Sequence, residues 1–395
     1  MASRLLRSLY LDTLASRRFP SPVIFLALFA ASALAVIWCG YPLAVRALGG
    51  LQRRRRFPSP LSHPRVSVIL ATCDDAVAIR ARVSDLLATS YPAALVEVIV
   101  AVDVMCASSV LPALVGLDAR VTVVTGDMPG GKATTLNAAV RVARHDLLIF
   151  ADTAQRFARD AIPELVMALG DPALGAVSGM LELRNAGTSL NLAERYWRYE
   201  RWLRAWEARL HSSVGVTGAI YAMRRELWSP LPAGLILDDV YVPMRLVLDG
   251  WRVGYAELAR AHDPRRFTAA EEYHRKVRTL TGNIQLCAWL PAVLNPFENP
   301  ILLQFVFHKL MRLLTPYLAV LALVGGVIVF VDFFVAGPTG WRDLLLACGA
   351  VGIGLCLMPR LRRALRAQLA WGVALQSSVV VATANGMRGQ WDVWQ

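Results

Sequence analysis

The chain has 395 residues, of which 56% are hydrophobic and 18% are charged, and its formal net charge is +13. Soluble domains are about 45–50% apolar and about 25% charged, so this composition excludes a disordered or collagen-like chain and favours a membrane protein with a water-soluble part. Arginine clusters beside apolar segments explain much of the charge through membrane topology, and because the sequence contains no nucleic-acid module we expect no nucleic-acid partner.

The first apolar segment is preceded by an N-terminal segment, residues 1–21. Residues 22–47 are apolar over more than the ~20 residues that a helix needs to cross a bilayer. Because they begin too far into the chain for an ordinary signal peptide, we predict a retained transmembrane helix. Arg53–Arg56 follow it and are typical of a cytoplasmic flank, but Arg17 and Arg18 precede it, so charge alone decides the orientation weakly.

Residues 60–278 have the composition of a water-soluble domain, in which short β-branched runs alternate with helical patterns. The expected strands are residues 66–71, 96–102, 121–125 and 147–151. The expected helices between them are residues 77–89, 109–117 and 134–144. Such alternation indicates a parallel, doubly wound α/β sheet, which binds ligands at the carboxyl ends of its strands. Asp103 and Asp152 each follow one of these strands, either as ligand-binding residues or as helix caps and turn residues.

A glycine pair precedes the third expected helix, in the sequence PGGKATTLN of residues 129–137. Backbone amides beside small residues can approach a phosphate closely, and Lys132 adds a positive charge. A plain helix-initiating turn would explain the same residues. The motif therefore marks a candidate phosphate contact that needs support from its neighbours.

Two acidic residues, Asp238 and Asp239, follow an apolar run, where one suits a general base and the other a helix N-cap. Thr217 and Gly218 lie in a run of small residues that would let a ligand approach closely. Residues 194–210 repeat aromatic side chains at helical spacing, which favours a core-packing face or else a wall near a sugar or the membrane surface.

The C-terminal part of the chain is apolar again. Residues 279–311 begin without charge but hold polar residues and a proline, so we expect interfacial helices there. Transmembrane helices are predicted over residues 312–334 and 342–359, and a transmembrane or re-entrant helix over residues 367–387. The cysteines form no CxxC pair, and we expect neither a zinc site nor a disulfide framework.

Taken together, these residues resemble the membrane-integrated family 2 glycosyltransferases, from about Pro64 to Arg312. That family includes the processive hyaluronan, cellulose and poly-N-acetylglucosamine synthases and many non-processive relatives. The resemblance implies an α/β GT-A domain inserted between the transmembrane helices of an integral membrane protein. It also implies a nucleotide-sugar donor and a divalent cation, Mg²⁺ or Mn²⁺.

The resemblance assigns roles to individual residues. Asp239 corresponds to the catalytic base, with Asp238 beside it, and Asp152 corresponds to the first acid of the metal-binding DxD motif. The segment that begins at Arg275 occupies the place of the QxxRW motif, whose basic residues would stabilise the leaving diphosphate. The expected donor-binding residues are Thr72, Asp74, Asp103, Lys132, Asp152, Thr217, Gly218, Arg275, Lys276 and Arg278.

Two positions depart from the family pattern. The DxD motif reads Asp152-Thr-Ala-Gln155, so the second carboxylate is missing, although one carboxylate, the diphosphate and water can still hold Mg²⁺. Thr279 stands where QxxRW has a tryptophan that contacts the acceptor in processive synthases. The second departure argues against long-chain processive synthesis and leaves glycosyl transfer itself expected.

The resemblance predicts an inverting hexosyl- or N-acetylhexosaminyltransferase. It would move a sugar from a cytoplasmic nucleotide-sugar to a glycan or lipid acceptor. We expect the donor to be a UDP-sugar and the process to be cell-surface or extracellular polysaccharide synthesis. We expect a multi-pass protein of the bacterial inner membrane, in contact with the lipid bilayer, whose catalytic domain is cytoplasmic. The alternatives are a non-processive lipid glycosyltransferase and a degenerate, non-catalytic scaffold subunit. A partner subunit and a homo-oligomer both stay open.

Overall fold

The computed structural model describes residues 22–52, 63–183, 192–265, 268–336, 346 and 359–392. The chain divides into two compact units. The first unit comprises residues 1–41 and 311–376, and the second comprises residues 42–310 and 377–395. The expected N-terminal segment 1–21 lies outside the described residues, as does the expected transmembrane helix 342–359 apart from two residues.

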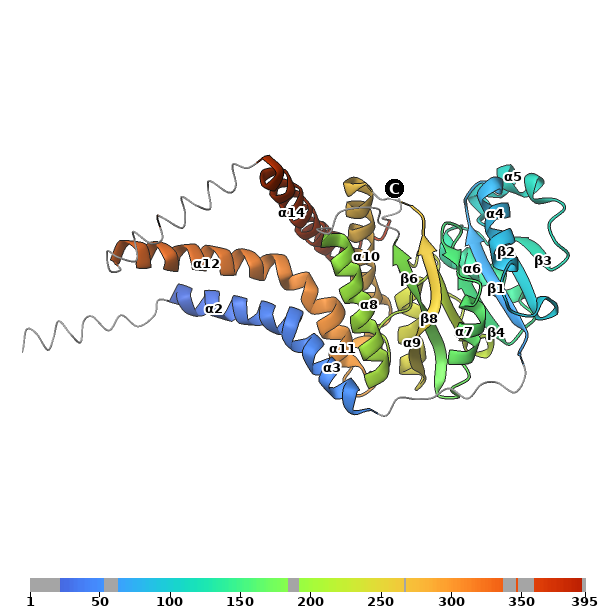
Figure 1. Ribbon diagram of the computed structural model, residues 1–395, viewed down its shortest axis with the longest axis horizontal. Helices are drawn as coiled ribbons and strands as arrows, with labels where there is room; N and C mark the ends of the chain where they lie inside the picture. Colours follow the sequence, from blue (N-terminus) through green and yellow to red (C-terminus); the bar gives the residue numbers. More distant parts are fainter. Residues whose placement is uncertain are drawn as a thin grey trace, which may run out of the picture. The chain divides into compact units, whose positions relative to one another are not determined.

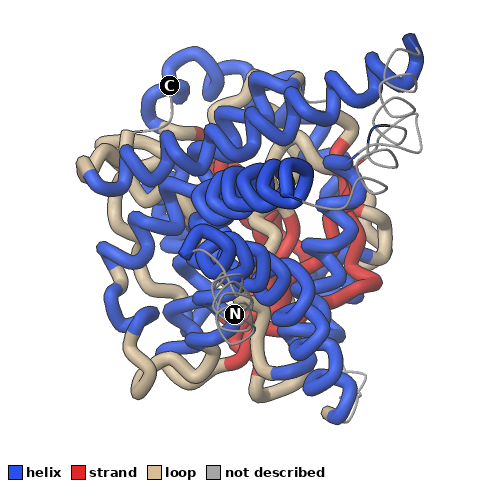
Figure 2. The backbone as a smooth tube through the Cα atoms, turned by 90° about the vertical axis from the view of Figure 1, so that its left-hand side faces the viewer, coloured by secondary structure: helices blue, strands red, loops and turns tan. Residues whose placement is uncertain are grey.

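A pair of apolar helices, α2 and α12, forms the described core of the first unit. The two helices lie side by side (Figures 1 and 2), and Gly325 leaves no room for a side chain between them, because a Cβ there would lie 2.4 Å from the Cβ of Ala27. The indole N–H of Trp38 donates to the hydroxyl of Thr315 over 3.2 Å. The segments are α2 (Pro22–Ala35), a π-helical segment (Val36–Gly40), a 3₁₀ turn (Met311–Leu314) and α12 (Thr315–Ala336).

Two continuous helical stretches of the described chain are long and apolar enough to cross a membrane. They are Pro22–Leu51 and Leu302–Val331, each with a mean hydropathy of 2.4. They contain the expected transmembrane helix at 22–47 and most of the one at 312–334. The expected segment at 367–387 lies within helix α14, and its place in a membrane stays a prediction.

In the described part of the second unit, an eight-stranded mixed sheet has the strand order β3-β2-β1-β4-β7-β6-β8-β5 (Figure 1). Strands β1 to β4 run parallel, β7 is antiparallel to β4 and β6, β8 is parallel to β6, and β5 is antiparallel to β8. The strands are β1 (Val66–Thr72), β2 (Val96–Val102), β3 (Val121–Thr125), β4 (Leu147–Ala151), β5 (Arg156–Phe157), β6 (Leu174–Leu183), β7 (Ile220–Arg224) and β8 (Arg252–Asp263).

Helices cover both faces of this sheet. The α-helices are α3 (Tyr41–Leu51), α4 (Ala76–Leu87), α5 (Val104–Val110), α6 (Lys132–Val142), α7 (Ala161–Ala168), α8 (Leu192–Leu210), α9 (Asp238–Leu248), α10 (Ala269–Trp289), α11 (Leu302–Phe305) and α14 (Pro359–Met387), of which α3 and α14 begin in the first unit. Single 3₁₀ turns are Ala93–Leu95, Leu111–Leu114, Arg225–Leu227 and Pro291–Leu294, and Val306–Leu310 is π-helical.

The parallel half of the sheet confirms the strands expected from sequence, while the helices differ in their bounds. Strands β2, β3 and β4 begin and end where they were expected, and β1 is longer by Thr72. The bounds of the helix expected at 109–117 were wrong, because α5 covers Val104–Val110 and the 3₁₀ turn Leu111–Leu114 follows it. Helix α5 begins earlier, since the carboxylate of Asp103 caps it by accepting from the N–H of Met105 over 2.9 Å.

Alternate side chains of the parallel strands enter two separate hydrophobic cores. Val68 and Leu70 of β1 pack in the core that α4, α5 and α7 share, whereas Ile69 packs in the core of α6 and α9. Burial on both faces explains why these strands read as continuous apolar runs.

The strand register brings distant polar residues to one edge of the sheet. Thr72 is paired with Val102, so Asp103 and the loop after β1 are neighbours. Ala151 is paired with Ile220 at the beginning of the antiparallel strand β7, so the residues just before Ile220 lie beside Asp152. This edge holds the candidate site.

Candidate active site

Lys132, Asp152 and Asp238 form a cluster of ion pairs, which we call the lysine–aspartate cluster. The Nζ of Lys132, at the start of α6, lies 3.1 Å from a carboxylate oxygen of Asp152 and 3.4 Å from one of Asp238. Asp152 follows β4 and Asp238 opens α9, so three separate segments converge here. The structure therefore joins three residues that the sequence singled out separately.

Burial and charge both act on this cluster. Burial raises the pKa of Asp238, Lys132 opposes that rise, and the neighbouring carboxylates of Asp239 and Asp152 add to it. Burial also lowers the pKa of Lys132, but Asp152, Asp238 and Asp239 outweigh this effect and raise the pKa above its ordinary value. Three carboxylates around one lysine leave an excess of negative charge that a bound cation would neutralise.

The expected catalytic base, Asp239, lies directly beside this cluster. The N–H of Val216 donates to the carbonyl of Asp239 over 2.8 Å, which fixes the start of α9 against the segment before β7. A Cβ on Gly218 would lie 3.3 Å from the Cβ of Asp239 and 3.7 Å from the Nζ of Lys132. A glycine at this position therefore leaves space between the expected base and the lysine.

A hydroxyl network orders the loop that follows β1. The hydroxyl of Thr153 donates to the hydroxyl of Thr72 over 2.8 Å. The Thr72 hydroxyl accepts from the N–H of Asp74 over 3.0 Å and lies 3.2 Å from its carboxylate. Thr72 and Asp74 are therefore held next to the turn that follows Asp152.

Asp103 orders the glycine–lysine loop as well as capping α5. One carboxylate oxygen accepts from the N–H of Gly131 over 2.6 Å and lies 3.2 Å from the hydroxyl of Thr135. Gly131 has a φ of +93°, a backbone conformation that residues with a Cβ rarely adopt. The cap interpretation of Asp103 is thus confirmed, and its role in donor binding stays a prediction.

Gln155, which stands near the missing second acid of the DxD motif, is oriented by an ion pair between buried Asp263 and half-exposed Arg265. Its Nε2 donates to the carboxylate of Asp263 over 2.8 Å, and Arg265 makes two bonds to the same carboxylate, of 3.0 and 2.8 Å. Because a carboxylate only accepts, the amide nitrogen must face Asp263, and the opposite Oε1 of Gln155 is a buried oxygen to which the described residues donate no hydrogen bond. Burial raises the pKa of Asp263, but the bonds from Arg265 outweigh it and lower the pKa.

Sequence reasoning missed Asp263 and Arg265. A usable signal was present, since Asp263 ends β8 as Asp103 and Asp152 follow β2 and β4. Asp152 and Gln155 offer oxygen ligands of the kind that Mg²⁺ and Mn²⁺ take together with substrate phosphates, and a metal site built on them stays a prediction.

A buried arginine, also missed from sequence, supports the backbone of Asp152. The Nε of Arg82 donates to the carbonyl of Asp152 over 2.9 Å, and its guanidinium pairs with Asp85 and lies 4.3 Å from the ring centroid of Phe157. Burial lowers the pKa of Arg82 to about 10. Arg82 therefore joins α4 to the turn that carries Asp152.

The basic residues of α10 face the aromatic side chains of α8. The guanidinium of Arg275 lies 4.9 Å from the ring centroid of Trp197, and the Nζ of Lys276 lies 4.3 Å from that of Tyr196. Such cation–π contacts join the two helices. A place for Arg275, Lys276 and Arg278 at a bound diphosphate stays a prediction.

The second half of α10 packs closely against the residue before Asp238. A Cβ on Gly282 would lie 2.4 Å from Cγ of Leu237. The Oε1 of Gln285 accepts from the N–H of Ile236 over 2.9 Å. Part of the segment expected to be interfacial therefore supports the start of α9.

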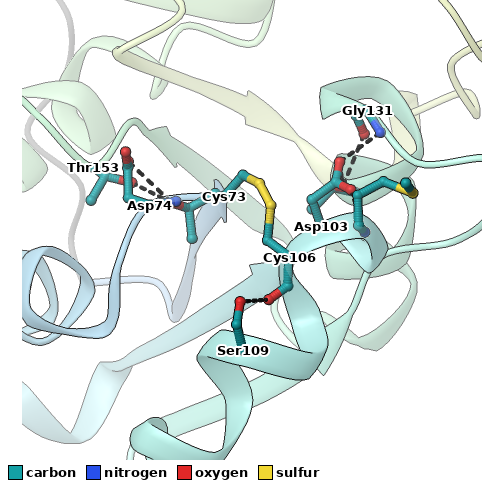
Figure 3. The surroundings of a disulfide bond; sticks show 10 residues. Cys73, Asp74, Asp103, Cys106, Ser109, Gly131 and Thr153 are labelled. Atoms are coloured by element: carbon teal, nitrogen blue, oxygen red, sulfur yellow. Dashed lines mark hydrogen bonds between the residues drawn. A yellow bond between two sulfur atoms is a disulfide. The ribbon is translucent and has the colours of Figure 1, made fainter.

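One expectation from the cysteines was wrong, because Cys73 and Cys106 form a disulfide (Figure 3). Their Cα atoms are 5.6 Å apart, within the usual range. Cys73 follows β1 and Cys106 lies in α5, so the parallel register of β1 and β2 brings them together although 33 positions separate them. Cys39 and Cys287 are unpaired.

Comparison with protein families assigns the chain to a family. A model described as "Glycosyltransferase like family 2" matches residues 63–286, more than half of the chain. The chain belongs to glycosyltransferase family 2. Among curated proteins, none matches it.

One solved structure shows the fold of this family 2 glycosyltransferase. The mannosyltransferase PcManGT from Pyrobaculum calidifontis, solved in complex with GDP-Man and Mn²⁺, is similar with a TM-score of 0.64 at 21% identity, over 92% of this chain and 99% of that one. A mycobacterial protein is similar with a TM-score of 0.41 at 18% identity, over 62% of this chain and 78% of that one. The first likeness identifies an α/β, GT-A-like fold.

Proposed function

We propose that this family 2 glycosyltransferase is an inverting enzyme that uses Asp239 as its catalytic base. The observation that carries the proposal is the lysine–aspartate cluster beside Asp239 and Gly218, at the carboxyl edge of the sheet. Doubly wound sheets bind their ligands at this edge. Asp239 would stand next to the sugar, and Lys132 and Asp152 next to the diphosphate.

The proposed reaction is a single displacement at the anomeric carbon. The carboxylate of Asp239 takes the proton of the acceptor hydroxyl, and that oxygen bonds to the anomeric carbon on the face opposite the nucleotide. The bond from the anomeric carbon to the diphosphate breaks, and its electron pair leaves with the diphosphate oxygen. The positive charge of Lys132 would stabilise the leaving group.

Asp152 and Gln155 would hold a divalent cation. When bound, the cation would neutralise charge on the diphosphate. The bonds from Gln155 to Asp263 and from Asp263 to Arg265 fix the amide so that an oxygen faces away from Asp263. PcManGT was solved with Mn²⁺, which is consistent with this choice.

We further propose that the donor is a UDP-sugar and that the acceptor is a glycan or lipid at a membrane. The helical stretches Pro22–Leu51 and Leu302–Val331 support membrane association, with the catalytic unit on the cytoplasmic side where nucleotide sugars are made. Since PcManGT binds GDP-Man, GDP-sugars belong in any donor test. A role in polysaccharide synthesis and a single transfer to lipid differ in the length of the product.

The deciding experiment measures nucleoside diphosphate release by the full chain in lipid nanodiscs. A panel of UDP- and GDP-sugars is offered with Mn²⁺ or Mg²⁺, with and without EDTA, and the products are sized. We expect metal-dependent release from one donor, and release that EDTA leaves unchanged would contradict the metal assignment. Failure to bind any nucleotide-sugar would favour a non-catalytic scaffold subunit instead.

A further inference from the structure

The disulfide lies between Thr72 and Asp74 on one side and Asp103 on the other, which are expected donor-binding residues that we assign here to the nucleotide. Cys73 stands between Thr72 and Asp74, and Cys106 is three residues beyond Asp103. Figure 3 shows the bridge running from the loop of Asp74 to α5, with Asp103 and the Gly131 loop next to it. The bridge therefore connects the loop after β1 covalently to the helix after β2.

The position of these thiols suits reversible oxidation. Cys73 is exposed and Cys106 is half-buried, so a small molecule in solution can reach the first sulfur. In a reducing compartment, disulfides are commonly transient or redox-sensing, and sensor cysteines are accessible and stand next to a resolving cysteine. The pair meets both conditions.

We propose that Cys73 and Cys106 are a thiol-modification site at which low-molecular-weight disulfides, such as glutathione disulfide, close the nucleotide part of the donor site. The inference rests on the proposed function, because it takes the residues around the bridge to hold the nucleotide. It adds a control on donor binding that the catalytic groups do not provide.

The chemistry is thiol–disulfide exchange in two steps. The thiolate of Cys73 attacks one sulfur of glutathione disulfide, the sulfur–sulfur bond of that molecule breaks, and one glutathione thiolate leaves. The thiolate of Cys106 then attacks the sulfur of Cys73 and displaces the second glutathione. Two protein thiols are oxidised and one glutathione disulfide is reduced to two glutathione thiols, and the two protons from the protein end on those thiols or in water.

Space explains why the bridge would weaken nucleotide binding. A planar base held between two groups needs about 7 Å between them, twice the van der Waals separation of ~3.5 Å. The bridged Cα atoms are 5.6 Å apart, which leaves no room for a base between Cys73 and Cys106. The N–H of Asp103 already donates to the carbonyl of Thr72 over 2.8 Å, so the strand ends are fixed in either state. After Thr72, the Cys73–Cys106 disulfide holds the loop that follows β1 close to α5.

The test measures UDP and GDP affinity by calorimetry, with Mn²⁺ and the full chain in nanodiscs. One sample is equilibrated with glutathione and another with glutathione disulfide, and mass spectrometry reports the state of Cys73 and Cys106. We expect the oxidised protein to bind its preferred nucleotide at least about tenfold more weakly, which corresponds to about 1.4 kcal/mol. Cys73→Ser, which lacks the thiol that attacks first, should bind like the reduced protein in both buffers, and Cys287→Ser should respond as the wild type does.

The outcomes separate this inference from the proposed function. Equal affinity in both buffers, with the bridge verified, overturns the inference and leaves the proposed function intact. Two unmodified thiols after incubation with glutathione disulfide overturn it as well. Cys73→Ala also lacks the attacking thiol and serves if Cys73→Ser does not fold. If neither nucleotide binds to the reduced protein or to either Cys73 variant, the proposed function fails, and the inference fails with it.

Discussion

Among the described residues of the second unit, two clusters each pair one basic side chain with two carboxylates, and the two differ in exposure. In the lysine–aspartate cluster the side chains of Lys132, Asp152 and Asp238 are 27%, 36% and 10% exposed, and the contacts are 3.1 and 3.4 Å. The glutamate–histidine cluster consists of Glu200 and Glu207 of α8 and His308. Its side chains are 8%, 0% and 1% exposed, and its contacts are 2.8 and 3.0 Å.

From this difference we infer which cluster is open to a ligand. Short, sealed contacts such as those of His308 fix one helix against another, and loss of one partner leaves buried charge behind. Longer, partly exposed contacts such as those of Lys132 can exchange one partner for a ligand group. We therefore assign chemistry to the lysine–aspartate cluster and structural support to the glutamate–histidine cluster.

The largest effect on activity is expected from Asp239→Asn. Loss of a general base lowers kcat by about 10²–10⁴-fold, whereas donor affinity should be unchanged because the amide keeps the shape of the side chain. Rate and affinity are measured by nucleoside diphosphate release and by calorimetry. The matched control is Asp249→Asn at the exposed end of the same helix, and an equal loss there would show that α9 was damaged rather than the base removed.

The next largest effect, on folding stability, tests the glutamate–histidine cluster. His308→Ala removes the base that both glutamates face, and breaking a buried pair costs about 3–5 kcal/mol of folding stability. We expect a clearly lower midpoint of thermal unfolding, measured in nanodiscs, while exposed His274→Ala stays close to the wild type. An unchanged midpoint together with lost activity would contradict the structural assignment of the glutamate–histidine cluster.

A smaller effect, on metal affinity, is expected when Asp263, which orients Gln155, is replaced. In Asp263→Asn the new amide can donate, so Gln155 is free to rotate and present nitrogen instead of oxygen to a cation. Loss of such outer partners typically weakens metal binding by about 10–100-fold. Spin-resonance titration of free Mn²⁺ in the presence of nucleoside diphosphate measures this directly. Exposed Asp160→Asn is the control, and Mn²⁺ affinity equal to the wild type in Asp263→Asn would refute the role of Gln155.

The predictability of the parallel half from sequence has a local cause. Asp103 and Asp152 directly follow apolar strands, and Lys132 opens a helix after two glycines, so each residue is marked by its immediate neighbours. The rule for parallel sheets then places all of them at one edge. Strand pairing does the rest, since Thr72 lies opposite Val102.

The remaining contacts depend on segments that are far apart and paired in ways no local pattern reports. His308 meets glutamates 101 and 108 positions earlier in the chain. The bond between Gln155 and Asp263 depends on β8, which pairs with β5 in the antiparallel sense. The aromatic spacing of α8 predicted a helix, but glutamates share its buried face with Leu203, which hydrophobic periodicity could not indicate.

The smallest effect concerns pH and sharpens the contrast between the clusters. Burial raises the pKa of Asp238 and Lys132 opposes that rise, so Lys132→Met should raise the pKa further. A carboxyl whose folded pKa exceeds its unfolded value of 3.8 binds more protons in the folded state, and stability then increases as pH falls through the raised pKa. One unit of pKa difference is worth about 1.4 kcal/mol. When the pH is lowered from neutral, the midpoint temperature of unfolding should therefore increase more for Lys132→Met than for the wild type. Lys132→Arg keeps the charge, so its unfolding midpoint should change with pH as that of the wild type does. If the midpoints of all three proteins change with pH in the same way, Lys132 does not affect the pKa of Asp238.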